Sequence, residues 1–169
     1  MAPFVPAHLV EVAPDAQPTR TAFILHGILG SGRNWRTLAR RIVRAWPAWR
    51  LVLVDLRNHG DSVGAPAPHS LRACAADLAA LAAHLGVAPE LVIGHSFGGK
   101  VAMVYAREFG ASIQGCWVLD ATPDAAPPPS AVDSEVIAVV QALEDLPVPL
   151  PSRAAVQEAL LRLGFSEGL

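Results

Sequence analysis

The segment Glu90-Leu-Val-Ile-Gly-His-Ser-Phe-Gly-Gly99 decides the fold. Residues 90–94 predict a buried strand, and a helix with apolar spacing follows from Phe97 until Gly110 stops it. Between them, Gly94-His95-Ser96-Phe97-Gly98 matches the Gly-x-Ser-x-Gly pattern of a nucleophile elbow. In that turn the flanking glycines let neighbouring backbone approach, and the helix dipole favours negative charge near the serine. Ser96 is therefore the candidate nucleophile.

The sequence of this turn has two other interpretations. Ser96 could serve only as the N-cap of the helix, since serine is a preferred capping residue. A glycine-rich turn between a strand and a helix is also found in dinucleotide-binding folds. The Gly-x-Gly-x-x-Gly spacing fails here, however, because Gly94 is followed by His95 and Ser96.

Outward from this segment, apolar strands alternate with amphipathic helices. This order predicts an α/β fold, a parallel sheet with helices on both faces. Ligands of such sheets bind at the carboxyl ends of the strands, where His26, Asp55, Ser96 and Asp120 are expected to gather. The strands are predicted at 21–25, 50–54, 90–94 and 114–120, with an edge strand within 5–12, and the helices at 34–46, 71–85, 97–109, 134–146 and 153–163.

Composition excludes several classes of protein. The chain has 169 residues, of which 52% are hydrophobic and 17% charged, with a net charge of −2, as expected of one folded domain. A nucleic-acid patch on the arginines of 33–44 is less favoured than a solvated helix face.

No apolar run approaches the ~20 residues of a membrane span. The N-terminus lacks a secretory signal, so a soluble intracellular protein is expected. Cys74 and Cys116 predict small buried side chains rather than a disulfide framework.

Four motifs together resemble one family. They are Leu-His-Gly-Ile-Leu-Gly-Ser at 25–31, Val-Asp-Leu-Arg-Asn-His-Gly-Asp-Ser at 54–62, Gly-His-Ser-Phe-Gly-Gly-Lys-Val-Ala-Met at 94–103 and Trp-Val-Leu-Asp-Ala-Thr-Pro at 117–123. The chain resembles the α/β-hydrolase superfamily, and within it the abhydrolase domain-containing protein 11 type, especially plant and algal members. The resemblance extends over about residues 20 to 169 and implies a serine hydrolase for carboxylic ester or lipid-like acyl substrates.

The resemblance also implies roles for individual residues. The N–H groups of Ile28 and Phe97 would form the oxyanion hole. Asp120 would be the triad acid, although it could instead cap its own loop, and many relatives carry the acid one strand later. His59 is expected to be structural, and residues expected to shape the loops beside Ser96 are His26, Gly27, Gly94, His95 and Gly98.

One feature departs from the family pattern. The triad histidine should follow the acid, yet the last histidine of the chain is His95. We therefore expect the chain as given to be a C-terminally truncated, nearly inactive form, with a hydrolase core at 20–121 and a proline-rich loop and start of a helical lid at 122–169. Self-association through an exposed sheet edge is a further expectation.

The expected partner is a small ester or acyl substrate, with no cofactor, metal or nucleic acid. Three alternatives stay open. They are a non-catalytic binding protein of the same fold, a serine acyltransferase or thioesterase, and, more distantly, a dinucleotide-dependent oxidoreductase.

Overall fold

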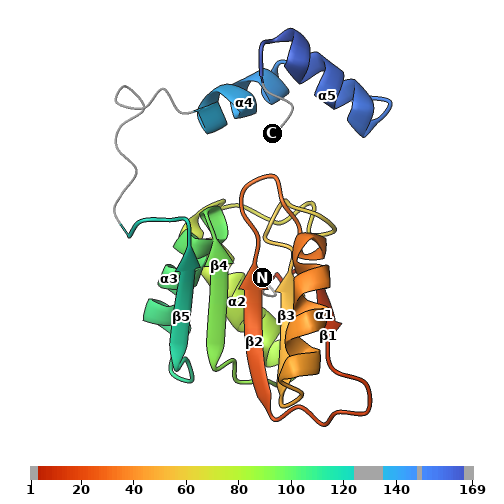
Figure 1. The fold of residues 1–169 in the computed structure, drawn as a ribbon. Coiled ribbons are helices and arrows are strands. Elements are labelled where there is room, and N and C mark those ends of the chain that lie inside the picture. Colours follow the sequence, from red (N-terminus) through yellow and green to blue (C-terminus); the bar gives the residue numbers. More distant parts are fainter. Residues whose placement is uncertain (1–3, 124–134, 148–149, 166–169) are drawn as a thin grey trace. The chain divides into compact units, whose positions relative to one another are not determined.

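The computed structural model describes residues 4–123, 135–147 and 150–165. The chain divides into two compact units, Met1–Pro123 and Asp124–Leu169. The first unit contains a five-stranded sheet with the order β1-β3-β2-β4-β5 (Figure 1). The strands are β1 (His8–Glu11), β2 (Arg20–Leu25), β3 (Trp49–Val54), β4 (Leu91–His95) and β5 (Gly115–Leu119).

The sheet is parallel except at one edge. The strands β2, β3, β4 and β5 run in the same direction, while β1 pairs antiparallel with β3. The predicted parallel sheet is confirmed, and the apolar run within 5–12 forms the predicted edge strand over four residues. Because β2 and β4 are neighbours, the loops after both strands meet at the centre of the carboxyl edge.

Helices cover both faces of the sheet, as predicted. One layer is α1 (Arg36–Ala45), whose buried Ala39 and Val43 pack on β2 and β3. The other layer is α2 (Leu71–Leu85) and α3 (Phe97–Phe109), which lie on the opposite face of the sheet (Figure 1). Each buried face contributes its own apolar cluster, so the central strands are enclosed on both sides.

Local sequence signals set the ends of the helices. The Ser70 hydroxyl accepts a hydrogen bond from the N–H of Ala73 and begins α2, and Gly86 ends that helix in the left-handed conformation. The predicted helix 34–46 is in fact two elements, a 3₁₀ turn η1 (Gly32–Trp35) followed by α1. The side chain of Asn34 accepts a hydrogen bond from the Ser31 N–H and holds that tighter first turn.

Strand β5 is the least enclosed strand. It forms one edge of the sheet, and Trp117 and Leu119 expose 59% and 40% of their surface. The prediction that both cysteines are buried is therefore right for Cys74 and wrong for Cys116, which is exposed. The apolar run at 115–119 predicts a strand, but it carries no information about whether a neighbouring element covers that strand.

The second unit contains the two further helices expected from the sequence. They are α4 (Glu135–Glu144) and α5 (Arg153–Arg162), and the Ser152 hydroxyl caps α5 by accepting from the Ala155 N–H. Most of the proline-rich loop predicted at 122–129 lies outside the described residues. The role of this unit as a lid stays a prediction.

Candidate active site

Ser96 lies in a strained turn between β4 and α3. Its backbone has φ 49° and ψ −115°, a left-handed conformation that a residue with a side chain rarely adopts. Gly94 and Gly98 lack side chains because other backbone atoms pass close to both residues. A Cβ at Gly94 would lie 2.2 Å from the carbonyl oxygen of Gly98, and a Cβ at Gly98 would lie 2.5 Å from that of His26. The spacing of the motif is thus explained by contacts within the turn.

The side chain of Ser96 makes no capping hydrogen bond to α3, although the residue occupies the N-cap position. This observation removes the interpretation that the serine is present only to cap the helix. Its backbone is anchored instead, because the Ser96 N–H donates to the Leu119 carbonyl at 2.8 Å. The hydroxyl is left available at the positive end of the helix dipole.

The loop after β2 lies directly against this turn. A Cβ at Gly27 would lie 2.9 Å from Nδ1 of His95 and 3.5 Å from Cβ of Ser96, so a side chain at position 27 would require the His95 ring to move. The N–H of Gly30 closes the loop by donating to the Gly27 carbonyl at 3.1 Å. Ile28 follows Gly27 in this loop, while Phe97 is the first residue of α3 and its N–H has no intrahelical acceptor.

The ring of His26 is buried and hydrogen-bonded to the backbone of two loops. Its Nδ1 donates to the Gly27 carbonyl at 2.7 Å, and its Nε2 accepts from the Leu56 N–H at 3.0 Å. Both ring nitrogens are occupied, and the ring is therefore neutral. Burial lowers the pKa of His26, which the hydrogen bond to Gly27 only partly opposes. The expectation that His26 shapes the loop is supported by this geometry, since its ring has no lone pair left to accept a proton from serine.

Asp55 fixes the two loops on the other side of β2. Its buried carboxylate accepts hydrogen bonds from the N–H groups of Gly32 and Asp61, at 2.7 and 2.8 Å. A Cβ at Gly60 would lie 2.2 Å from Oδ2 of the same carboxylate. The position of Asp55 at the carboxyl edge was predicted, but its use as a loop anchor was not, because the partners are backbone groups distant in sequence.

The segment after Asp55 is held by a buried ion pair. Arg57 binds Asp77 of α2 through two hydrogen bonds of 2.7 and 2.8 Å, and it also donates to the carbonyls of Pro66 and Pro68. Nδ1 of His59 donates to the Arg57 carbonyl, and the His59 ring stacks on Phe97 at 6.0 Å between centroids. Sequence analysis missed Asp77, because an acidic residue inside a helix normally predicts an exposed position.

Asp120 directly follows β5 and has a positive φ of 54°. Its side chain is 89% exposed, and Oδ2 lies 3.9 Å from Nε2 of His95. The His95 ring in turn contacts Trp35 edge-on, with centroids 6.5 Å apart. Asp120 therefore lies at the same edge of the sheet as Ser96 and has an accessible carboxylate.

None of the histidines is hydrogen-bonded to the Ser96 hydroxyl within the part of the chain that the structure describes. His26 and His59 are used by the loops, and Nδ1 of His69 accepts from the Asn58 amide at 3.1 Å. His8 binds the Pro6 carbonyl, and His84 lies exposed in the last turn of α2. The site therefore contains a candidate nucleophile, candidate oxyanion donors and an accessible carboxylate, without a base in contact with the serine.

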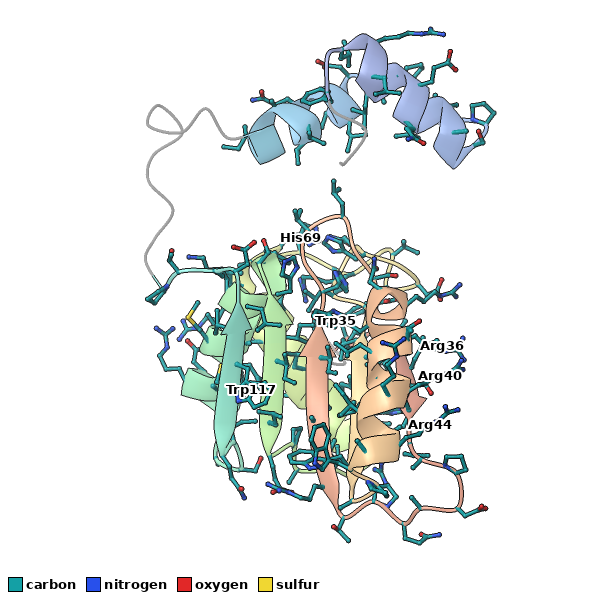
Figure 2. The ribbon with its side chains drawn as sticks, viewed as in Figure 1. Trp35, Arg36, Arg40, Arg44, His69 and Trp117 are labelled. Atoms are coloured by element: carbon teal, nitrogen blue, oxygen red, sulfur yellow. The ribbon has the colours of Figure 1, made fainter. Side chains whose placement is uncertain are left out.

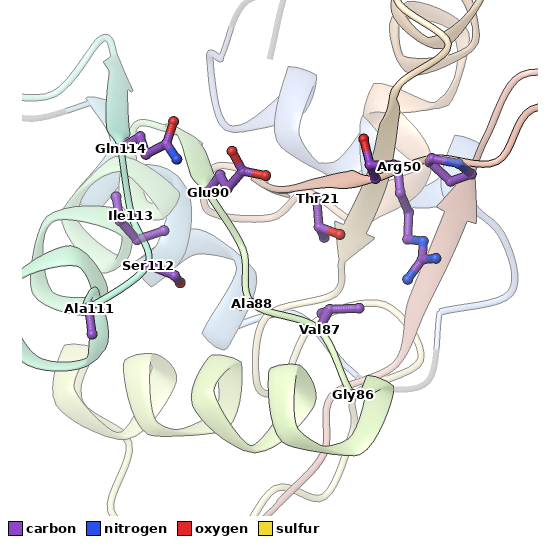
Figure 3. Close-up of a pocket in the computed structure, with 12 residues that line it drawn as sticks. Thr21, Arg50, Gly86, Val87, Ala88, Glu90, Ala111, Ser112, Ile113 and Gln114 are labelled. Carbon is purple, nitrogen blue, oxygen red and sulfur yellow. The ribbon is translucent and has the colours of Figure 1, made fainter.

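The structure has one cavity near Ser96 and another at the opposite edge of the sheet. One of about 410 Å³ adjoins the site, with Phe97, His59, Leu71 and Cys74 among its lining residues. Burial raises the pKa of the Cys74 thiol to about 11, so this thiol stays protonated. The other, of about 610 Å³, lies at the amino ends of the strands between Thr21, Arg50 and Glu90 (Figure 3). It is at the opposite edge of the sheet and forms no part of the candidate site.

Comparison with known proteins agrees with this architecture. Residues 23–146 match the family model described as alpha/beta hydrolase fold. The chain belongs to the α/β-hydrolase family. Among solved structures, a marine microorganism esterase aligns with a TM-score of 0.76 and 26% identity, covering 94% of this chain and 58% of that one.

Curated members of the family include two similar lipases. The sn-1-specific diacylglycerol lipase ABHD11 of Mus musculus is 36% identical over 142 residues, which are 83% of this chain and 45% of the mouse protein. Lipase LipV of Mycobacterium tuberculosis is 35% identical over 154 residues, which are 90% of this chain and 54% of LipV. The chain thus spans about half the length of these relatives, and the resemblance to the ABHD11 type is confirmed.

The described residues contain neither a helix that could cross a membrane nor a cluster of metal-binding side chains. No helix among them has the length and apolar character needed to cross a bilayer. Within the same residues, no group of three or more histidine, cysteine, aspartate or glutamate side chains is arranged to hold a metal ion.

Proposed function

We propose that the protein is a serine esterase or lipase in which Ser96 attacks the carbonyl carbon of a carboxylic ester or lipid-like acyl substrate. The single observation that supports this most strongly is the strained Ser96 backbone combined with a hydroxyl that caps nothing. The strained residue adds no capping hydrogen bond to α3, and a strained turn of this kind presents the nucleophile above the sheet in serine hydrolases.

The reaction proceeds through an acyl-enzyme. As the Ser96 oxygen bonds to the carbonyl carbon, the hydroxyl proton passes to a base and the carbonyl oxygen becomes negatively charged. The N–H groups of Ile28 and Phe97 stabilise that oxyanion, and each such donor contributes about 3 kcal/mol in serine hydrolases. The alcohol leaves with the proton, and water then releases the acid from Ser96 by the same route.

Asp120 is the proposed acid of the triad. Its exposed carboxylate lies next to the elbow, where it can orient a histidine that bonds to the Ser96 hydroxyl. The chain carries no histidine after His95, and none of the rings described above is hydrogen-bonded to the Ser96 hydroxyl. We therefore assign the base to sequence outside these residues, and we expect the 169-residue chain to be nearly inactive. Loss of the triad histidine alone costs about 10⁶ in turnover.

The substrate class follows from the relatives. Diacylglycerol lipase and lipase are the names of the two curated proteins described above. The region after Pro123 is proposed to form the start of a lid that helps to shape the acyl pocket. A small ester or acyl compound is therefore the expected ligand.

One observation favours a second candidate function. With no base bonded to Ser96 in the described part of the chain, a non-catalytic protein that binds acyl compounds at the same edge would have the same geometry. A fluorophosphonate probe separates the two, because covalent labelling requires an activated serine. Transfer to alcohols or cleavage of thioesters would use the same acyl-enzyme and is distinguished by product analysis with each acceptor.

The test uses the protein extended to the length of its relatives. Rapid fluorophosphonate labelling of Ser96, located by peptide mass spectrometry and absent in Ser96→Ala, is the expected result. Ile28→Pro removes one oxyanion N–H and should lower kcat for a p-nitrophenyl ester by about 10²–10³. An extended protein that folds but is never labelled at Ser96 would refute the catalytic assignment and leave the binding function.

A further inference from the structure

Helix α1 carries a concentrated positive charge on its solvent side. All four arginines of the helix, together with Arg33 in η1, are exposed, and α1 contains no acidic residue. Three of them, Arg36, Arg40 and Arg44, follow one another at intervals of four residues and extend outward from the helix (Figure 2). We call this set, Arg33, Arg36, Arg40, Arg41 and Arg44, the arginine face.

The carboxylates that bind these arginines neutralise them only in part. Glu11 of β1 bonds both Arg36, at 2.8 Å, and Arg40, at 3.2 Å. Asp61 bonds Arg33 at 3.1 Å. Five cations thus meet two carboxylates, and the face keeps an excess of three positive charges, although the whole chain has a net charge of −2.

Exposed apolar side chains lie at both ends of the arginine face. Ile28, Leu29 and Val63 are 40%, 62% and 72% exposed in the loops at the carboxyl edge, where η1 and α1 begin. Trp46, 61% exposed, follows the last turn of α1. Surfaces that bind the interface of a lipid bilayer combine exposed apolar side chains with a cationic helix, as this surface does.

We propose that the arginine face docks the protein on a membrane surface rich in anionic phospholipids. The apolar loop tips beside Ser96 would then enter the headgroup region, so that a lipid substrate reaches the site without crossing water. The face is the outer side of a helix packed on a sheet, and it has apolar side chains at both ends, which a bilayer boundary accommodates and a phosphate backbone does not. A planar anionic surface is therefore the better fit.

The test is vesicle flotation with the chain as it exists. Vesicles of phosphatidylcholine are compared with vesicles in which about one third of the lipid is phosphatidylglycerol. The protein should float with the anionic vesicles only, and added salt should release it. Arg41→Gln with Arg44→Gln should lower the partition coefficient about 25-fold, since each arginine near the surface contributes about a factor of five.

A matched variant controls for net charge. Arg72→Gln with Arg107→Gln removes two positive charges from α2 and α3, on the other layer, and should bind anionic vesicles as the unmodified chain does. Equal flotation with neutral vesicles, or an equal loss in both double variants, would overturn the proposal. So would tighter binding of a DNA duplex than of anionic vesicles through the same arginines. Ser96 takes no part in this measurement, so its outcome is independent of the proposed hydrolase activity.

Discussion

Ser96 has a backbone conformation that destabilises the fold, and its side chain carries the hydroxyl on which the proposed reaction depends. Its backbone is held at φ 49° by the Leu119 carbonyl on one side and the first turn of α3 on the other. Such a conformation costs of order 1–3 kcal/mol for a residue with a side chain. Glycine would relieve that cost but would remove the hydroxyl.

We expect the Ser96→Gly variant to be more stable than the Ser96→Ala variant. Alanine keeps the Cβ and therefore the strain, whereas glycine adopts positive φ readily and loses only part of the gain to its larger unfolded-state entropy. We expect a difference of about 1 kcal/mol in the free energy of unfolding by urea. Equal stability of the two variants would show that the turn is not strained.

His26 should make the stability of the fold depend on pH. Because burial lowers its pKa below the ordinary value of 6.5, the unfolded chain binds the proton more readily than the folded chain. Stability from this group is fully present above pH 6.5 and is lost as the pH falls through 6.5 toward the lowered pKa. The slope cannot exceed about 1.4 kcal/mol per pH unit for one proton.

Urea unfolding at about pH 7.5 and about pH 5.5 measures this effect. His26→Gln retains a hydrogen-bonding side chain that does not titrate, so its stability should change less between the two pH values. His84→Gln alters an exposed histidine and should keep the pH dependence of the unmodified chain. If His26→Gln and the unmodified chain have the same slope, the buried neutral ring is not its source.

At the scale of elements, the loop between β3 and α2 is organised by the Arg57–Asp77 pair. Both side chains are nearly buried, at 7% and 6% exposure, and Arg57 bonds two loop carbonyls as well as the carboxylate. Removing one partner leaves a buried charge without compensation, which costs about 3–5 kcal/mol.

The expected result is that Asp77→Ala loses about that amount of stability in chemical denaturation, while Arg57→Met with Asp77→Leu loses less. Apolar residues of similar volume need no partner, although the loop carbonyls of Pro66 and Pro68 lose a donor. A double variant less stable than the single one would mean that the loop bonds of Arg57, rather than the pair, provide the stabilisation.

The elements could be predicted from sequence because their signals are local. Ser70 and Gly86 bound α2, and the glycines of the elbow bound β4 and α3, within the segments that they affect. The contacts that complete the site are not local. Asp55 anchors backbone groups at Gly32 and Asp61, and the burial of Asp77 depends on an arginine 20 residues earlier. No periodicity reveals such pairs.

At the scale of the molecule, the first unit ends in an open sheet edge at β5. Trp117 and Leu119 expose apolar surface there, and in the described part of the chain no strand pairs with the outer side of β5. Unpaired edges of this kind favour association with a second copy. Self-association of the 169-residue chain therefore stays a prediction.

Light scattering after size exclusion tests it. We expect the unmodified chain to elute as dimers or larger species, and Trp117→Lys to shift it toward the monomer, because a lysine on an edge strand opposes pairing. Trp46→Lys replaces another exposed tryptophan away from β5 and should leave the distribution unchanged. A sharp monomer peak from the unmodified chain would contradict the prediction.

Under the proposed function, Ser96 is a nucleophile whose base is not among the 169 residues. The most direct measurement is the turnover of a short p-nitrophenyl ester by the 169-residue chain and by its Ser96→Ala variant. We expect the two rates to be indistinguishable, because the proposal leaves the Ser96 hydroxyl of this chain without a histidine that accepts its proton. Turnover on the order of 1 s⁻¹ that disappears in Ser96→Ala would show that a base is already present and would contradict it.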